Sequence, residues 1–455
     1  MSPISPCPPV STGPTARNVF ALAWPMTIKA IFLHGTVVID TYLVAALGET
    51  SLAAVGLAAA IAGFALGAIQ AFSSAMQIRT AQAFGTGNQV FLKSALASGM
   101  VVNLAVGVLG LLAILVFGAP LINALAPSTE VATLARSYLG IFLLVILGEA
   151  VGQCISSYLN GCGETKVPLY SLCLSVPVNI LTSVALIHGY WGLPALGVSG
   201  AAIGSVVAVA VQVSFLGVRL IIAAGHLRHI AGWRENGFPR SLLRHLGFAL
   251  PIAATFLSAA ISTQVCALIY VRMDLSDFAA LTLIAPWIQV TGTIGMQWAI
   301  ATGIIVAQLL GQGCEAARLQ HFLSRAWRAS FVASAGVALL LLILCLSADM
   351  LYSNLSLQTR DIVLAFLPIV ILLPFPKGSN AICGNTLRAS GDTIYVMNLF
   401  VAAQWLFRVP VTAIAVIWLD LGAVLVLSIQ LWEEIIKFPA FHRRILSGKW
   451  KNRSW

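Results

Sequence analysis

Long apolar runs separated by short polar segments dominate the sequence of 455 residues. A helix needs about 20 mostly apolar residues to cross the hydrocarbon core of a bilayer, whereas a membrane barrel alternates apolar and polar residues in segments of about ten. The unbroken runs therefore predict an all-α polytopic membrane protein with twelve transmembrane helices. The predicted spans are residues 19–46, 52–78, 94–117, 132–157, 168–188, 196–222, 246–271, 278–305, 325–347, 362–386, 393–418 and 421–438.

The composition supports a membrane protein and excludes two other classes. Apolar residues make up 59% of the chain and charged residues 9%, against about 45–50% and about 25% in soluble domains. So few charges cannot cover the surface of a soluble globule, and so many apolar residues are the opposite of a disordered chain. The eight cysteines form no CxxC pair and have no histidine at ligand spacing, so neither a metal nor a redox cofactor is predicted.

Basic residues predict the orientation in the membrane. If the N-terminus is cytoplasmic, seventeen Lys and Arg residues lie in cytoplasmic segments, and three, Arg136, Arg272 and Arg360, lie on the opposite side. Because cytoplasmic loops carry an excess of Lys and Arg, both termini are expected inside the cell. The net charge of +10 then reflects topology and contact with the lipid bilayer, and no nucleic-acid partner is expected.

The sequence repeats itself at an offset of 226 residues. This shift aligns Pro25 with Pro251, and the AQxxGxG motif at residues 81–87 with a copy at residues 307–313. Each copy holds six spans, and an even number returns the chain to the same side, so two parallel bundles related by a pseudo-two-fold axis along the membrane normal are expected. The predicted domains are an N-terminal bundle at residues 1–225, a cytoplasmic linker at 226–245, a C-terminal bundle at 246–440 and a basic cytoplasmic tail at 441–455.

A few ionisable residues lie well inside the predicted spans. A charge at the centre of a bilayer costs about 2.5–3.5 kcal/mol on insertion scales, so such residues are candidates for function, with a structural ion pair as the competing explanation. They are Lys29, His34, Asp40, Glu149, Lys377 and Arg408. All except Asp40 are assigned to a substrate cavity.

Asp40 is the strongest candidate for ion coupling. It lies toward the outer half of the first span, and the helical period places Thr36 and Lys29 on the same stripe. Apolar surroundings favour the protonated form of a carboxyl group, which lets it exchange protons near neutral pH. This is what a proton-coupled carrier requires, although a buried structural acid would give the same sequence.

The other interior residues leave alternatives open. Glu149 serves either as a substrate counter-ion or as the partner of Lys29 or Arg408. A structural role is favoured for Arg408, because a nearby proline frees a backbone carbonyl for it. Lys377 follows two prolines in a helix that is expected to be broken, and its role is open. His34 is either an interhelical histidine or a proton relay.

Six motifs occur in order along nearly the whole chain. They are IDT at residues 39–41 with LG at 47–48 and LAAVG at 52–56, AQAFGTGN at 81–88, LNGCGETKVP at 159–168, ALGVSGAAIGS at 195–205, AQLLGQG at 307–313 and LRASGDT at 387–393. In this order they resemble the MATE (multidrug and toxic compound extrusion) family of cation-coupled exporters. The resemblance implies a V-shaped fold of twelve helices in the inner membrane that exports organic cations in exchange for H⁺ or Na⁺.

The resemblance also implies the coupling residues. Asp40, Asn179 and Ser205 match family positions in the N-terminal half, and Ser183 and Thr36 accompany them. The chain departs from the family at Ser183 and at residue 259, an alanine, since many members carry an acid at these two positions. A hard Na⁺ site then lacks charged oxygen ligands, so H⁺ is favoured as the coupling ion.

Two other functions are considered. A flippase for a lipid-linked anionic precursor is the alternative, because Lys29, Lys377 and Arg408 could hold a diphosphate in a cationic cavity. A membrane-embedded prenyltransferase needs clustered carboxylates to bind Mg²⁺. No DxxxD motif occurs within a span, so the protein is not expected to be an enzyme. The expected partner is a small amphiphilic substrate, and the protein is expected to function as a monomer.

Overall fold

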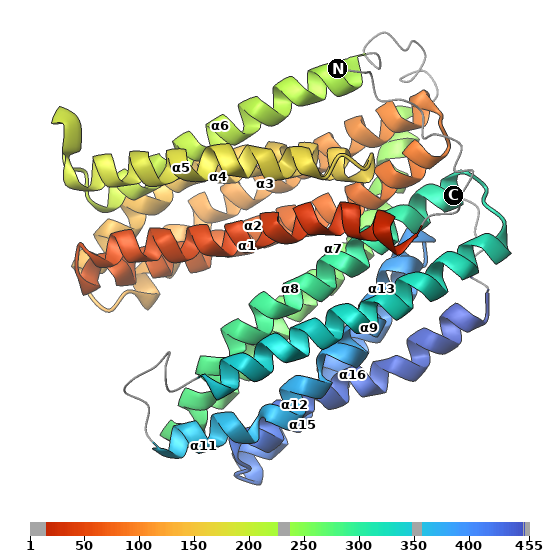
Figure 1. Ribbon diagram of the computed structural model, residues 1–455. Coiled ribbons are helices and arrows are strands. Elements are labelled where there is room, and N and C mark those ends of the chain that lie inside the picture. Colours follow the sequence, from red (N-terminus) through yellow and green to blue (C-terminus); the bar gives the residue numbers. More distant parts are fainter. Residues whose placement is uncertain (1–14, 226–236, 348–356, 449, 451–455) are drawn as a thin grey trace. The chain divides into compact units, whose positions relative to one another are not determined.

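The computed structural model of the protein (Figure 1) describes residues 15–225, 237–347, 357–448 and 450. Eleven spans within these residues are long and apolar enough to cross a membrane. A twelfth helix, α16 (Ala423–Leu446), carries five charged residues. Together they confirm the all-helical fold and correspond one to one with the twelve predicted spans.

Each predicted span of the first half is a single helix. The helices extend past the apolar runs at most ends, and α2 and α3, with 37 residues each, are about 55 Å long. This exceeds the hydrocarbon core of about 30 Å, so their ends reach the head-group region. The helices are α1 (Ala16–Ala45), α2 (Glu49–Gly85), α3 (Gln89–Leu125), α4 (Thr129–Gly161), α5 (Lys166–His188) and α6 (Val198–Ala224), with the short η1 (Tyr190–Gly192) before α6.

The second half is less regular, because two of its spans are interrupted. The tenth span is divided at Phe366 and Leu373, where prolines begin the next segments, and the broken helix expected around Lys377 is present. The eleventh span contains two π-helical segments, η3 and η4. The elements are α7 (Phe238–Tyr270), α8 (Leu275–Gly311), α9 (Ala316–Leu346), α11 (Leu357–Ala365), α12 (Leu367–Leu372), α13 (Pro374–Ala389), α14 (Thr393–Ala402), η3 (Ala403–Arg408), α15 (Val409–Ala413), η4 (Ile414–Trp418) and α16.

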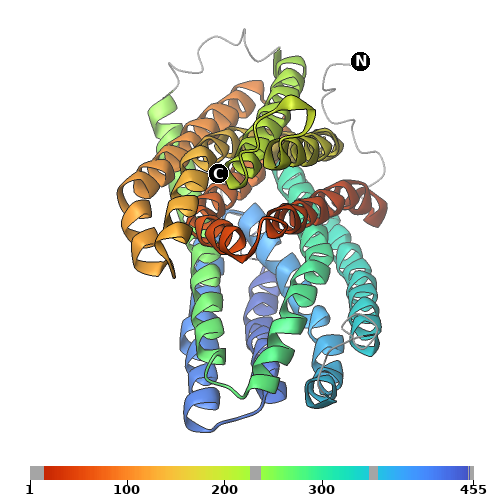
Figure 2. The ribbon, with the colours of Figure 1, turned by 90° about the vertical axis from the view of Figure 1, so that its left-hand side faces the viewer.

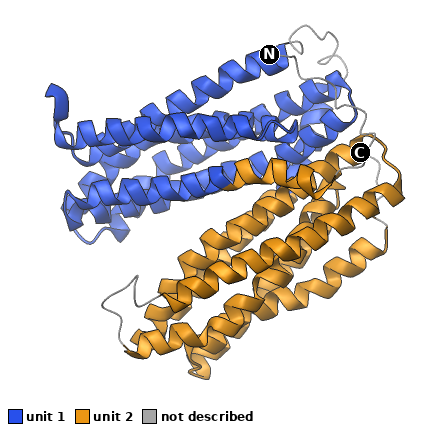
Figure 3. Ribbon diagram, viewed as in Figure 1, with its two compact units in different colours: residues 1–8, 28–250 blue, residues 9–27, 251–455 orange. Residues whose placement is uncertain are grey.

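Contacts divide the described residues into two compact units (Figure 3). Unit 1 holds residues 28–250 and unit 2 holds residues 15–27 and 251–450, so the change of unit falls inside the continuous helices α1 and α7. Both changes lie within three residues of a proline that the sequence repeat pairs, Pro25 or Pro251.

Two predicted domain limits differ from the helices. Residues 226–236 of the expected linker lie outside the described residues, and α7 already begins at Phe238. In the expected tail, α16 continues to Leu446. The fully buried Phe441 gives a reason, because its contacts hold the last turns of α16 within unit 2.

Small residues let the helices of unit 1 approach one another closely. Ala54, Ala58 and Ala62 recur every fourth residue on α2, so they lie on one face, and each is at most 1% exposed. They belong to a core that includes Ala132 and Ala135 of α4. Close backbone approach over such residues is the usual basis of helix packing in membranes.

The core of unit 2 is built around the broken tenth span. Phe366 and Val370 are fully buried there, in a cluster with residues of α8, α9 and α16. Figures 1 and 2 show α8 and α9 running side by side. Helix α13 packs against both α8 and α9. The pocket described below lies between these three helices.

The repeated AQxxGxG motif ends a helix in both units. Its last glycine, Gly87 in one copy and Gly313 in the other, has φ of +66° and +67°, a region that residues with a side chain rarely adopt. In the first copy the Asn88 side chain then caps α3 by accepting a hydrogen bond from the amide of Val90 at 2.9 Å. The motif therefore encodes a turn between helices.

Candidate functional site

Asp40 lies near the C-terminal end of α1 and is half-buried within unit 1. Its Oδ1 atom is buried and has no hydrogen-bond partner among the described residues. Thr36, one turn earlier, donates its hydroxyl to the carbonyl of Phe32 at 2.9 Å. Tyr138 of α4 is buried and lies close enough to interact electrostatically with Asp40. The carboxyl group thus stands in weakly polar surroundings with a tyrosine nearby.

A second polar group is buried between α5 and α6. Asn179, Ser183 and Ser205 are each at most 8% exposed. Asn179 Nδ2 donates to Ser205 Oγ at 3.5 Å, whereas Asn179 Oδ1 and Ser183 Oγ have no partner among the described residues. Tyr138 interacts with Ser205 as well as with Asp40. Tyr138 thus interacts both with the acid predicted on α1 and with Ser205 on α6.

Glycines of α6 bring this polar group together. A Cβ atom on Gly204 would collide with Ser183 Oγ, and one on Gly200 would lie 2.7 Å from the carbonyl oxygen of Leu186. Because these positions carry no side chain, the backbones of α5 and α6 approach closely. Gly200 and Gly204 thus allow the close approach at which Asn179 faces Ser205.

Replacing Gly204 with valine is expected to disrupt this packing. The added side chain has no room beside Ser183, and overpacking of this kind costs about 1–3 kcal/mol. The expected result is a lower midpoint of thermal unfolding for the purified protein in detergent. Gly217→Val on the same helix is the matched control, because nothing lies within 4 Å of a Cβ atom there. Equal stability of the two variants would contradict the proposed role of Gly204.

Lys29 of α1 and Glu149 of α4 both belong to unit 1. They interact electrostatically between α1 and α4, and Gln153 donates its amide to Glu149 Oε2 at 2.9 Å. Of the partners considered for Glu149, Lys29 shares its unit and interacts with it electrostatically, without an ion pair within 4 Å. His34 lies on an exposed part of α1.

Unit 2 contains a buried network of charges. Lys437 Nζ lies 3.0 Å from Glu433 Oε1 and 2.9 Å from Glu434 Oε1. Arg408 Nη1 lies 3.8 Å from Glu433 Oε2, and Asn380 donates to Glu434 Oε2 at 2.8 Å. Lys437 is 1% and Glu433 5% exposed. Arg408 therefore has a carboxylate partner in its own unit.

This network is not evident from the sequence. The interior residues predicted from the sequence do not include Glu433, Glu434 or Lys437. The available signal was the spacing, since Lys437 follows the two acids by four and three residues, which places all three on one side of a helix. The Lys437 amine also lies over the ring of Phe400, 4.6 Å from its centre.

Another repeated motif forms equivalent ion pairs in the two units. Glu164 of the GET sequence lies 3.1 Å from Arg219 of α6. Asp392 of the GDT sequence lies 2.7 Å from Arg444 of α16. In each unit, an acid that follows one helix thus forms an ion pair with an arginine of a later helix. Both motifs therefore have a structural role.

Comparison with known proteins identifies the family. A sequence model described as MatE matches the chain twice, at residues 25–185 and at residues 251–414. The two matches begin 226 residues apart, which is the offset of the internal repeat. The chain belongs to the MATE family. Its relatives are transporters, and it is a multi-pass membrane protein.

Named relatives of this MATE protein include transporters from two rhizobia. It is 28% identical over 386 residues to a probable multidrug resistance protein NorM from Rhizobium meliloti, covering 80% of this chain and 79% of the relative. A NorM from Bradyrhizobium diazoefficiens is 27% identical over 427 residues, covering 89% and 87%. A solved multidrug resistance MATE transporter of the MOP superfamily, in an outward-facing conformation, is similar over all of both chains, with a TM-score of 0.83 and 16% identity.

The MATE fold groups the predicted site residues by unit. Unit 1 holds the predicted coupling residues, and Tyr138 interacts with two of them, Asp40 and Ser205. The sequence does not single out Tyr138, because Tyr158 lies in the same span. Unit 1 also holds Lys29 and Glu149. Unit 2 holds Lys377 and Arg408.

Proposed function

We propose that this MATE protein is a secondary antiporter that exports amphiphilic, cationic organic compounds in exchange for H⁺. It would lie in the cell inner membrane with both termini in the cytoplasm, as the excess of basic residues in one set of loops indicates. Its relatives named multidrug resistance proteins support export of drugs as the activity. The expected form is a monomer.

The observation that carries the proposal is the environment of Asp40. Asp40 belongs to an apolar helix. One oxygen of its carboxyl group is buried and has no hydrogen-bond partner among the described residues. A carboxyl group in such a place readily takes up a proton, because the charged form is poorly solvated. Protonation from the outside would then shift the population toward the state that releases substrate.

The ligands available near Asp40 favour H⁺ over Na⁺. Asn179, Ser183 and Ser205 offer neutral oxygens, so Asp40 supplies the one formal negative charge of this group. Hard cations are bound chiefly by several charged or carbonyl oxygens. The described residues also contain no cluster of three or more His, Cys, Asp or Glu residues able to hold a metal ion.

Transport in proteoliposomes under separate gradients tests the coupling ion. With tetraphenylphosphonium as the probe, an imposed pH gradient is expected to drive uptake well above the rate without a gradient. A Na⁺ gradient at equal pH on both sides should leave uptake at the rate without a gradient. Uptake driven by the Na⁺ gradient alone would contradict proton coupling and leave antiport itself in place.

The alternative, a flippase for a lipid-linked anionic precursor, is less well supported by the arrangement of cations. Such a function needs several basic residues free to hold a diphosphate. Lys29 has Glu149 as an electrostatic partner, and Arg408 has Glu433. Lys29 and Lys377 form no ion pair within 4 Å among the described residues, and they belong to different units, Lys29 to unit 1 and Lys377 to unit 2.

A further inference from the structure

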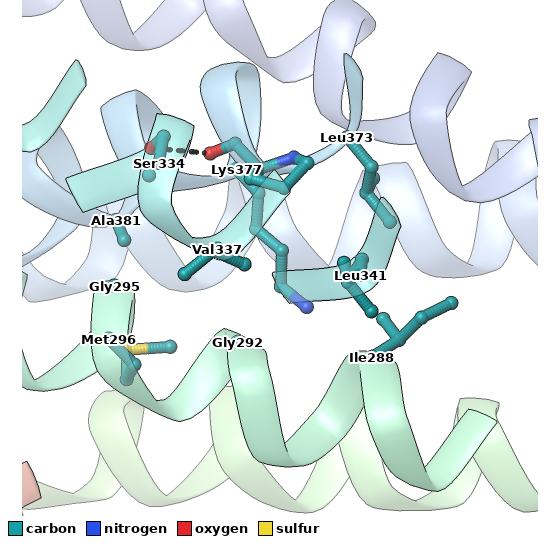
Figure 4. Close-up of a pocket in the computed structure, with 12 residues that line it drawn as sticks. Ile288, Gly292, Gly295, Met296, Ser334, Val337, Leu341, Leu373, Lys377 and Ala381 are labelled. Atoms are coloured by element: carbon teal, nitrogen blue, oxygen red, sulfur yellow. Dashed lines mark hydrogen bonds between the residues drawn. The ribbon is translucent and has the colours of Figure 1, made fainter. Parts of the chain in front are cut away.

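Unit 2 contains a pocket between α8, α9 and α13 (Figure 4). Its walls are largely apolar, with Ile288, Val337 and Leu341 among them. Lys377 extends across the pocket toward α8 (Figure 4), and its Nζ would lie 3.5 Å from a Cβ atom on Gly292. The amine of a lysine therefore ends inside an apolar pocket.

The other polar side chain that lines the pocket is already satisfied. Ser334 donates its hydroxyl to the carbonyl oxygen of Pro374 at 3.0 Å. Gly378 makes room for it, since a Cβ atom there would lie 2.8 Å from Ser334 Oγ. The Lys377 amine, in contrast, has no hydrogen bond to any described residue and no described carboxylate within 4 Å.

The charges around the pocket do not balance. Lys377 interacts electrostatically with the network of Glu433, Glu434, Lys437 and Arg408. In this network the two acids already pair with Lys437 and Arg408. Lys377 is therefore a third positive charge against two negative charges. An uncompensated charge inside a membrane protein is costly, and an anion next to Lys377 would remove the imbalance.

We propose that this pocket binds the anionic head group of an amphiphile, a carboxylate or phosphate, with Lys377 as its counter-ion. The cavity volume is about 40 Å³, enough for about three water molecules or one such head group. Pockets for whole drug-sized ligands measure about 300–1,000 Å³, so the apolar part of the amphiphile lies outside the enclosed space. This site goes beyond the proposed export of cations and does not depend on Asp40.

Binding to the purified full-length protein in a neutral detergent tests the site. The probe is 4-phenylbutyrate, with 4-phenylbutylamine as the cationic counterpart of the same size, and affinity is measured by calorimetry. Lys377→Met is expected to weaken binding of phenylbutyrate at least about tenfold, because a hydrogen bond to a charged group is lost. Lys377→Arg should retain it, and so should the control Lys166→Met at an exposed position.

A second variant tests the pocket while keeping the amine. Nothing lies within 4 Å of a Cβ atom on Gly295, so Gly295→Leu should fill the space without displacing a neighbour, and should also weaken binding about tenfold. This variant keeps the test valid if Lys377→Met does not fold. Wild-type affinity for phenylbutyrate and for anionic lipid in Gly295→Leu, or in folded Lys377→Met, would overturn the proposal.

A lipid arm distinguishes the source of the anion. The rise in the midpoint of thermal unfolding is measured with added phosphatidylglycerol and with phosphatidylcholine. A rise with phosphatidylglycerol alone that depends on Lys377, without phenylbutyrate binding, identifies a lipid phosphate as the ligand. Binding of phenylbutyrate that depends on Lys377 identifies a free amphiphile. Because no gradient is used, these results are independent of whether the protein couples to H⁺.

Discussion

Asp40→Asn is expected to abolish uptake driven by a pH gradient into inverted membrane vesicles, down to the level of vesicles without the protein. Asparagine has nearly the same shape as aspartate, so α1 should still insert and pack. It cannot bind and release a proton at neutral pH, however, and the exchange of a proton for substrate would lose its proton carrier. Tetraphenylphosphonium uptake, normalised to the amount of inserted protein, is the measurement.

Two further variants serve as controls for this result. Asp40→Glu keeps a carboxyl group and should retain part of the coupled transport. Glu130→Gln removes an exposed carboxylate at the start of α4 and should transport at the wild-type rate. If Asp40→Asn takes up the probe as fast as the wild type under the same pH gradient, Asp40 is not the coupling residue.

Glu433→Ala is expected to destabilise unit 2 by about 3–5 kcal/mol, the cost of leaving a buried charge without its partner. Lys437 is 1% exposed and would keep Glu434 alone, while Arg408 would lose the carboxylate that lies 3.8 Å away. With Lys377 counted together with the network, the excess of positive charge would rise from one to two. Thermal unfolding of the purified protein and its yield in the membrane are the measurements.

A double variant separates charge balance from loss of packing. Glu433→Ala combined with Lys437→Met restores the original excess of one positive charge, so its unfolding midpoint should lie above that of Glu433→Ala. Replacing a buried ion pair by apolar side chains is often neutral or stabilising. A double variant less stable than Glu433→Ala would show that the network does not act through its charge balance.

The sequence predicts most of the fold because the bilayer restricts what an apolar run can form. A run of about 20 apolar residues has to become a helix, since the backbone has no other partners in lipid. All twelve spans follow from this, as does the break near Lys377, where prolines remove backbone donors. The sequence does not predict the change of unit inside α1 and α7, because it depends on contacts between distant residues.

The surroundings of Asp40 are only partly predictable for a similar reason. Asp40 is recognisable because a lone acid in an apolar run is rare. Tyr138 is not recognisable from the sequence, because its interactions with Asp40 and Ser205 arise only in the folded protein. The pairing of Arg408 with Glu433 also joins residues of different spans, which no local pattern reveals.

The charges of α16 also bear on how the protein enters the membrane. Three of them, Glu433, Glu434 and Lys437, are held by one another and by Arg408 and Asn380 of earlier spans. On insertion scales each would cost about 2.5–3.5 kcal/mol at the centre of a lone helix. Because α16 follows its partners along the chain, it leaves the ribosome after them and can meet them already in the bilayer. Its membrane integration and the completion of unit 2 are then a single step of biogenesis.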